Sequence, residues 1–299
     1  MTRALKGVHR PHRTLTRCVV MVSFMDLVAT APGYAQIAVT SSTLVERIAV
    51  PGETYRDTVT IHNSSSSIQT VSLSLADYSF DADGSTQFDE PGSRPRSSAG
   101  WIQLSQRTVS VLPQSDVTVG YSVAVPSTAP LPVGSYWGVV LVEVDPSAAM
   151  PSDSAGLAVI PRLRYAVQLA THVGSTGQAL LAFGEPLLPR GARFVDRGRA
   201  GPPHPAPDVS TPPSGGLLAV DVAHVGTRAC RPILRVEVYG DAGTLAYRAT
   251  APRGLLYPGA SLRQTFDLSS LASGDYTVLL LADVGGDVAQ GTTLQVHIQ

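Results

Sequence analysis

Side chains that could do chemistry are spread along this chain rather than grouped. The nearest approach to a motif is a run of oxygen-bearing residues at Asp81, Asp83, Ser85, Asp89 and Glu90. Oxygen ligands at alternate positions could hold calcium. However, Gly84 comes two positions too early for the calcium loop of an EF-hand, and Asp-Gly between two apolar runs is a common hairpin signal. We therefore interpret this segment as a turn between strands.

The remaining candidates indicate no catalytic or metal site. His62, His172, His224 and His297 each lie alone on a strand-like pattern, without the paired spacing of a zinc site. Asp283 and Asp287 flank a glycine pair that is typical of another turn. The sequence contains no Gly-x-Ser-x-Gly elbow and no phosphate-binding glycine loop. We therefore expect a protein that is not an enzyme and that needs no cofactor or metal.

Composition then indicates what kind of scaffold carries these residues. The chain has 299 residues, of which 43% are hydrophobic and only 15% charged, with 27 Gly and 23 Pro. This combination favours many short strands joined by turns over helical bundles or disorder. Five of the 22 basic residues and one of the 23 acidic residues precede Gln36, so the remaining chain has a net charge near −5. Such an acidic balance argues against nucleic-acid binding.

The N-terminus resembles a secretory signal peptide. A basic segment ends at Arg17, an apolar run begins at Cys18 and reaches Ala31, and Gly33 and Ala35 stand at the small-residue positions of a cleavage site. We expect residues 1–35 to direct export to the periplasm or the cell surface. No segment is long and apolar enough to predict a membrane span in the mature chain. Cys230 would be the only mature cysteine, which excludes an internal disulfide.

Alternating strands dominate the first part of the mature chain. The segment IQTVSLSLADYSF places Val71, Leu73 and Leu75 on one face and serines on the other. The almost uncharged stretch from Trp101 to Pro146 reads as three strands separated by proline-bearing connections. About seven strands fit between residues 36 and 173, at the spacing of an immunoglobulin-like β-sandwich.

A second β-sandwich is expected over residues 174–299. Regular strand patterns resume at Leu217 and continue to the last residue, with turns at Asp241–Gly243, Pro258–Gly259 and Ser273–Gly274. A segment at about 189–216 is rich in Pro, Gly and Arg and cannot build a core. It is either an insertion in the second domain or a linker. The predicted fold class is therefore all-β, with two tandem immunoglobulin-like β-sandwich domains after a signal peptide.

Four segments in order resemble the first domain of periplasmic pilus chaperones, the PapD-like group. They are RIAVPGETYRDTVTIHNSS, WIQLSQRTVSVLPQ, LPVGSYWGVVLVEVDP and PRLRYAVQLATHV, and together they span about residues 39–173. The resemblance implies a non-enzymatic chaperone that caps or assists pilus or surface subunits by β-strand addition. Its partners would be protein subunits that lack a strand, and an uncovered strand edge of that kind otherwise aggregates.

The resemblance also implies a set of binding residues. In that family two basic residues in the cleft between the domains hold the client's C-terminal carboxylate, an anion that suits a guanidinium fork. Arg47 falls where the first of these residues stands, and Arg164 matches the second, with Arg162 as its alternate. The donor-strand face would come from Tyr165, Val167 and Leu169, or from Leu157, Val159 and Leu163.

Two other interpretations remain open from the sequence alone. The two arginines could simply be solvated charges on strands. The protein could also be a structural or adhesive surface protein whose tandem immunoglobulin-like modules bind a polymer or another envelope protein.

Overall fold

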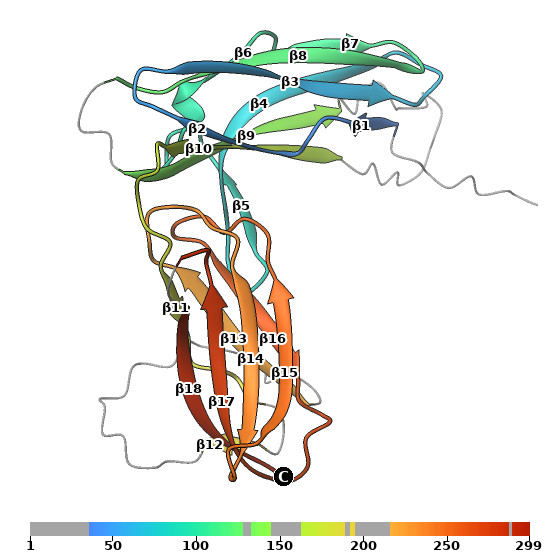
Figure 1. Ribbon diagram of the computed structural model, residues 1–299. Helices are drawn as coiled ribbons and strands as arrows, with labels where there is room; N and C mark the ends of the chain where they lie inside the picture. Colours follow the sequence, from blue (N-terminus) through green and yellow to red (C-terminus); the bar gives the residue numbers. More distant parts are fainter. Residues whose placement is uncertain (1–35, 128–132, 145–162, 189–191, 195–215, 287–288) are drawn as a thin grey trace, which may run out of the picture. The chain divides into compact units, whose positions relative to one another are not determined.

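A computed structural model of the chain describes residues 36–127, 133–144, 163–188, 192–194, 216–286 and 289–299. The expected signal peptide (residues 1–35) lies outside these residues, as do Arg162, Leu157, Val159, Asp287 and nearly all of the 189–216 segment. The regular secondary structure of the described part is β-strand apart from one helical element, the 3-10 turn η1 (Ala99–Trp101). The fold is all-β, with two tandem immunoglobulin-like sandwiches, one built from β1–β10 and the other from β11–β18 (Figure 1). The predicted fold class is confirmed in this respect.

Two sheets form the first sandwich. One has the strand order β1-β3-β8-β6, and the other has the order β2-β10-β9-β4-β5, with β7 also paired to β4. The strands are β1 (Ile37–Val39), β2 (Leu44–Ala49), β3 (Thr54–Asn63), β4 (Gln69–Phe80), β5 (Thr86–Asp89), β6 (Ile102–Leu104), β7 (Thr108–Val111), β8 (Ser115–Ala124), β9 (Gly134–Val144) and β10 (Arg164–Val173).

Strand alternation places the apolar side chains of these two sheets against each other. On β4, Val71 and Leu73 are buried in the core, while Ser72 and Ser74 on the opposite face are exposed. This confirms the core face that the sequence predicts. Strand β9 is buried on both faces, because Val140 and Val142 enter the central core and Val139 and Leu141 enter a smaller cluster on the other side.

The acidic run after β4 is a turn, as its sequence predicts. Phe80 pairs with Thr86 across the β4–β5 hairpin, and Gly84 adopts φ +87°, in the left-handed region that glycine tolerates best. The Asp83 carboxylate accepts a hydrogen bond from the Ser85 amide at 2.8 Å, as an Asx turn does. Asp83 and Gly84 therefore have a structural role, because both stabilise the backbone of the turn.

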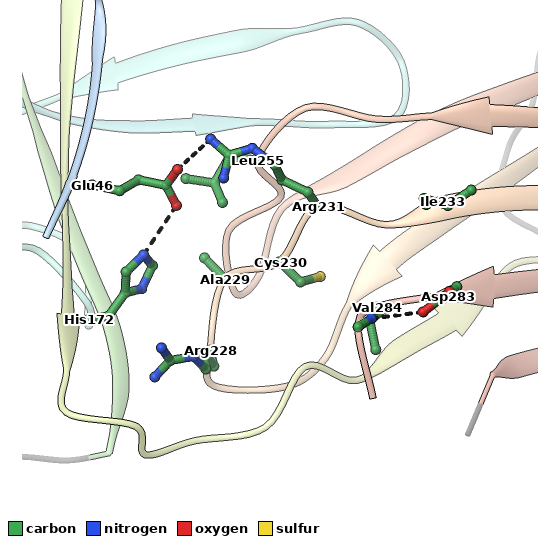
Figure 2. Close-up of a pocket in the computed structure, with 11 residues that line it drawn as sticks. Glu46, His172, Arg228, Ala229, Cys230, Arg231, Ile233, Leu255, Asp283 and Val284 are labelled. Carbon is green, nitrogen blue, oxygen red and sulfur yellow. Dashed lines mark hydrogen bonds and ion pairs between the residues drawn. The ribbon is translucent and has the colours of Figure 1, made fainter. Parts of the chain in front are cut away.

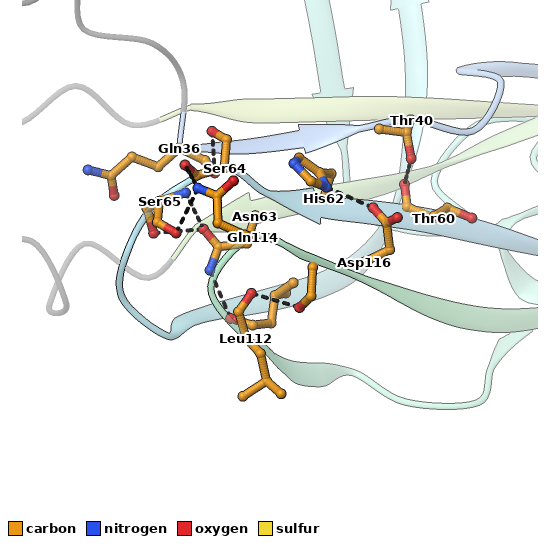
Figure 3. Close-up of polar contacts among 12 residues, drawn as sticks. Gln36, Thr40, Thr60, His62, Asn63, Ser64, Ser65, Leu112, Gln114 and Asp116 are labelled. Carbon is orange, nitrogen blue, oxygen red and sulfur yellow. Dashed lines mark hydrogen bonds and ion pairs between the residues drawn. The ribbon is translucent and has the colours of Figure 1, made fainter.

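A buried amide closes the turn after β3. Asn63 is fully buried, and its Nδ2 donates to the carbonyls of Ser67 at 2.8 Å and Val111 at 2.9 Å. Its Oδ1 accepts from the Ser65 amide at 2.9 Å (Figure 3). One side chain thus satisfies three backbone groups that the turn takes out of the sheet.

The second sandwich also has two sheets, ordered β11-β13-β16 and β12-β18-β17-β14-β15. Its strands are β11 (Leu181–Phe183), β12 (Arg193–Phe194), β13 (Leu217–His224), β14 (Ile233–Gly240), β15 (Leu245–Pro252), β16 (Ser261–Asp267), β17 (Gly274–Asp283) and β18 (Gln290–Ile298). Large buried residues such as Leu218, Leu234, Leu256 and Leu280 fill the space between the sheets.

Aromatic and polar contacts join the two sandwiches. Trp137 of β9 stacks on Tyr257 of the second sandwich, with ring centroids 4.6 Å apart. The Tyr257 hydroxyl donates to Gln168 Oε1 of β10 at 2.9 Å. Tyr257 is fully buried, so this contact is a packed interface between the two sandwiches.

Candidate functional site

Strand β10 carries four of the predicted binding residues, Arg164, Tyr165, Val167 and Leu169. It pairs antiparallel with β9 along its whole length, from Arg164 opposite Glu143 to Val173 opposite Gly134. On its other side it pairs in parallel with β2, but only from Gln168 to Val173. The first four residues of β10 therefore form a free edge in the described part of the chain.

The backbone groups on this free edge can be identified. The Gln168 amide donates to the Thr43 carbonyl at 2.8 Å, and the Gly174 amide donates to the Ala49 carbonyl at 2.9 Å, so even-numbered residues point toward β2. Because backbone direction alternates along a strand, the N–H and C=O groups of Arg164 and Ala166 point the same way. No described residue pairs with them on that side. They are the polar groups that an added strand would bind.

Arg164 stands at the beginning of this free edge. Its guanidinium forms an ion pair with Glu143 on β9 and lies over the Phe88 ring, 5.9 Å from the ring centroid. The side chain is about half exposed, at 47%. Arg164 is thus accessible, although its charge already has a carboxylate partner.

The predicted donor face has a different orientation from the one expected. Val167 and Leu169 are each 1% exposed and lie in the core of their own sandwich. Tyr165 packs against the same core and donates its hydroxyl hydrogen to the Ile37 carbonyl at 2.7 Å. A two-residue repeat places all three side chains on the inner face of β10, so they hold this strand in place and do not project toward a partner.

Arg47 lies near the far end of β10 from Arg164. It is opposite Thr171 in the parallel pair, seven positions along β10 from Arg164. Its guanidinium contacts Asp57 of β3 at 3.3 Å, and its side chain is 52% exposed. The structure therefore does not bring Arg47 and Arg164 together, and these two residues cannot hold one carboxylate.

The neighbouring residue, Glu46, faces the junction instead. Its carboxylate forms an ion pair with Arg231 of the second sandwich and accepts a hydrogen bond from His172 Nε2 at 3.2 Å (Figure 2). Strand alternation explains why Glu46 and Arg47 point to opposite faces of β2. Sequence reasoning missed Glu46, because only the parallel pairing of β2 with β10 shows which face meets the second sandwich.

A cavity of about 400 Å³ lies beside this ion pair. The residues lining it come from both sandwiches; the charged or titratable ones are Glu46, His172, Arg228, Cys230, Arg231 and Asp283. Arg228 Nη1 donates to the Gly174 and Thr176 carbonyls, at 3.0 Å each. Both arginines of the cavity are therefore already bonded within the chain.

The environment of the cavity shifts its titratable groups. Burial lowers the pKa of His172, and the nearby arginine charges act in the same direction, while the Glu46 carboxylate opposes them. Burial by itself would raise the pKa of Glu46, but hydrogen bonds from Arg231 and His172 outweigh it and hold that pKa below its ordinary value. Burial raises the pKa of the Cys230 thiol to about 11, which disfavours the reactive thiolate.

Within the described residues, no group of three or more His, Cys, Asp or Glu side chains is arranged to hold a metal ion. In that same part of the chain, no helix has the length and apolar character needed to cross a membrane.

Comparisons with known proteins give structural likeness only. No protein-family model matches the chain, and no curated protein matches its sequence. Among solved structures, the class 5 fimbriae chaperone CfaA is 11% identical, with 86% of this chain and 98% of that chain covered and a TM-score of 0.42. The CsuC–CsuE chaperone-tip adhesion subunit complex of Acinetobacter baumannii is 11% identical, with 87% and 98% covered and a TM-score of 0.41.

The CupB2 chaperone of Pseudomonas aeruginosa is also similar, at 13% identity, with 86% of this chain and 99% of that chain covered and a TM-score of 0.35. Each of these solved structures contains a chaperone.

Proposed function

We propose that this chain is an exported, non-enzymatic chaperone-like protein that binds a pilus or surface subunit by adding a β-strand at the free edge of β10. The observation that carries the proposal is the incomplete pairing of β10, whose Arg164 and Ala166 backbone groups face no described strand. A partner with a missing strand carries unpaired N–H and C=O groups along its own edge, and these can form hydrogen bonds with the unpaired groups of β10.

The chemistry of this edge defines the kind of partner that it fits. Arg164 and Ala166 offer two N–H donors and two C=O acceptors, each worth about 1 kcal/mol in a formed ladder. Because Tyr165 and Val167 face the core of their own sandwich, main-chain bonds rather than these side chains would supply the affinity of this edge. We infer that the partner is an extended protein strand.

The place of action follows from the same proposal. The signal-peptide-like segment at residues 1–35 supports export, and the proposed site of action is the periplasm or the cell surface. The proposed partners are protein subunits, with no nucleic acid and no insertion of the mature chain into a membrane. The client carboxylate would not be held by Arg47 and Arg164 together, because Arg47 on β2 lies opposite Thr171, seven positions along β10 from Arg164.

The test is co-purification of the tagged chain with co-expressed candidate subunits that lack a strand. Ala166→Pro removes one N–H from the free edge and leaves the ladder with β9 intact, since the Ala166 N–H points away from β9. We expect this variant to recover about fivefold less subunit, as loss of about 1 kcal/mol would give.

Thr250→Pro is the matched control. Thr250 lies on β15, an edge strand of the second sandwich, and its N–H also faces away from the paired strand, because the Arg253 amide donates to the Pro232 carbonyl. We expect this variant to recover the subunit as the parent does. Equal recovery with Ala166→Pro and Thr250→Pro would refute strand addition at β10.

A further inference from the structure

A continuous chain of hydrogen bonds crosses the junction between the sandwiches. The Ala229 amide of the second sandwich donates to Ser135 Oγ of β9 at 2.9 Å, and Ser135 Oγ lies 2.7 Å from His172 Nδ1. His172 Nε2 lies 3.2 Å from Glu46 Oε1, and the other oxygen of Glu46 forms the ion pair with Arg231 (Figure 2). This series of hydrogen bonds therefore begins and ends in the second sandwich, at Ala229 and Arg231, and passes through the first sandwich between them.

The donors and acceptors in this series of hydrogen bonds fit a neutral imidazole of His172. Ser135 Oγ accepts the Ala229 N–H, so its own hydrogen is free to be donated to His172 Nδ1. An accepting Nδ1 requires that Nε2 carry the proton, and Nε2–H then donates to the Glu46 carboxylate. In this arrangement the Ser135 hydroxyl, both ring nitrogens of His172 and both carboxylate oxygens of Glu46 each have a hydrogen-bond or ion-pair partner.

Protonation of His172 disturbs that arrangement. Nδ1 would become a donor toward Ser135 Oγ, which then could no longer donate its hydrogen to the imidazole. Ser135 is fully buried, and its hydroxyl has no other hydrogen-bond partner in the described part of the chain. An unpaired buried O–H is unfavourable, and the balance shifts toward a state in which water reaches Ser135.

The charges around His172 act in both directions, and burial decides the outcome. Burial disfavours a cation at His172 most, Glu46 favours it, and Arg228 and Arg231 disfavour it. Asp283 and Cys230 line the same cavity, and the Arg96 guanidinium donates to the Ser135 carbonyl at 3.3 Å. His224 contacts the same loop, because its Nε2 lies 2.7 Å from the Arg228 carbonyl.

We propose that Ser135, His172 and Glu46 form a proton-sensitive latch, which ties the two sandwiches together at neutral pH and loosens in mild acid. The order Ser–His–Glu is also that of some hydrolases, but Ser135 is 0% exposed and offers no path for a substrate. The latch is independent of strand addition at β10.

The sign of the pH dependence follows from the lowered pKa of His172. A histidine whose pKa is depressed in the closed state stabilises that state above the ordinary value of about 6.5, and this contribution is lost as the pH falls through the depressed pKa. The pKa of Glu46 is also depressed, so its contribution is lost in stronger acid, below about 4.5.

The test is hydrogen exchange of the Ala229 amide in the full-length protein at pH 7.5 and pH 5.5, corrected for intrinsic exchange. We expect protection to fall by up to about tenfold at the lower pH, the largest change that one histidine of ordinary pKa 6.5 can cause over this interval. His172→Gln should abolish this pH dependence. His224→Gln is the control for the other buried histidine of the region, and it should retain the pH dependence.

Protection that does not change with pH in the parent protein would overturn the proposal, and so would loss of the response in His224→Gln but not in His172→Gln. A direct titration of His172 by NMR in the parent protein removes any dependence on how the variants fold. It should show an Nε2–H tautomer and a pKa below that of a solvent-exposed histidine. A pKa at or above the ordinary value would contradict the latch.

Discussion

At Gly134, the first residue of β9, the backbone of the first sandwich packs against the loop that carries Thr227. A Cβ atom on Gly134 would lie 1.9 Å from the Thr227 carbonyl oxygen, and the φ of Gly134 is +108°. No side-chain rotation relieves a clash with a carbonyl group, so Gly134→Ala must move the backbone. The next residue, Ser135, donates its amide hydrogen to the same Thr227 oxygen at 2.9 Å.

The expected cost of Gly134→Ala can be estimated from these contacts. The unfavourable φ contributes about 1–3 kcal/mol, and the loss of the hydrogen bonds from the Ser135 amide to Thr227 and from the Gly134 amide to Thr176 contributes about 1 kcal/mol each. The sum is about 4 kcal/mol, which corresponds to a fall in Tm of about 10 °C for a protein of this size. Scanning calorimetry measures it directly.

Gly100→Ala is the matched control for this substitution. Gly100 has no atom within 4 Å of an added Cβ, and its φ is not positive. We expect its Tm to remain within about 2 °C of the parent value, as for surface substitutions generally. If Gly134→Ala melted like Gly100→Ala, the close packing of β9 against the second sandwich would be refuted.

Three further substitutions or reagents test other parts of the structure. Asn63→Asp replaces the amide that donates to the Val111 carbonyl with a group that cannot donate, so we expect the free energy of unfolding to fall by about 2–3 kcal/mol in urea titrations. An unchanged midpoint would contradict this hydrogen bond. Tyr257→Phe removes the hydroxyl that donates to Gln168 and should cost about 1 kcal/mol, whereas a stabilised variant would show that this bond is not formed. Cys230, whose pKa burial raises to about 11, should resist alkylation at pH 8 in the folded protein and react in urea, as mass spectrometry of its peptide would show; fast labelling of the folded chain would exclude its burial.

Strand periodicity made much of the fold predictable from the sequence. Val71 and Leu73 face the core as their alternation predicts, and the Asp-Gly pair at Asp83 and Gly84 makes the β4–β5 turn. These signals are local: a two-residue repeat and a turn-forming dipeptide act over a few positions, so they survive in a single sequence.

The functional residues were harder to predict because they depend on pairing between distant segments. Arg47 is adjacent to Glu46 in the sequence, yet the two face opposite sides of β2. Only the parallel register of β2 against β10 decides which of the two meets the second sandwich, and parallel pairing of remote strands leaves no local signal. The same register separates Arg47 from Arg164 and leaves the beginning of β10 unpaired.

The inward orientation of Val167 and Leu169 illustrates the same limit. A shift of one residue in register exchanges the two faces of a strand, so an alternating pattern predicts that one face is buried but not what buries it. In this protein Tyr165, Val167 and Leu169 of β10 pack into the core of their own sandwich. Only the backbone groups at the free edge of β10 remain for a partner to bind.

Hydrogen exchange of the Ala166 amide, measured with and without a candidate subunit that lacks a strand, tests the proposed strand addition most directly. Ala166 faces the free edge of β10, so its amide should exchange rapidly in the chain alone and become protected at least tenfold when the subunit binds, while the already paired amide of Gln168 changes little. Stable binding of the subunit with no added protection at Ala166 would contradict strand addition at this edge.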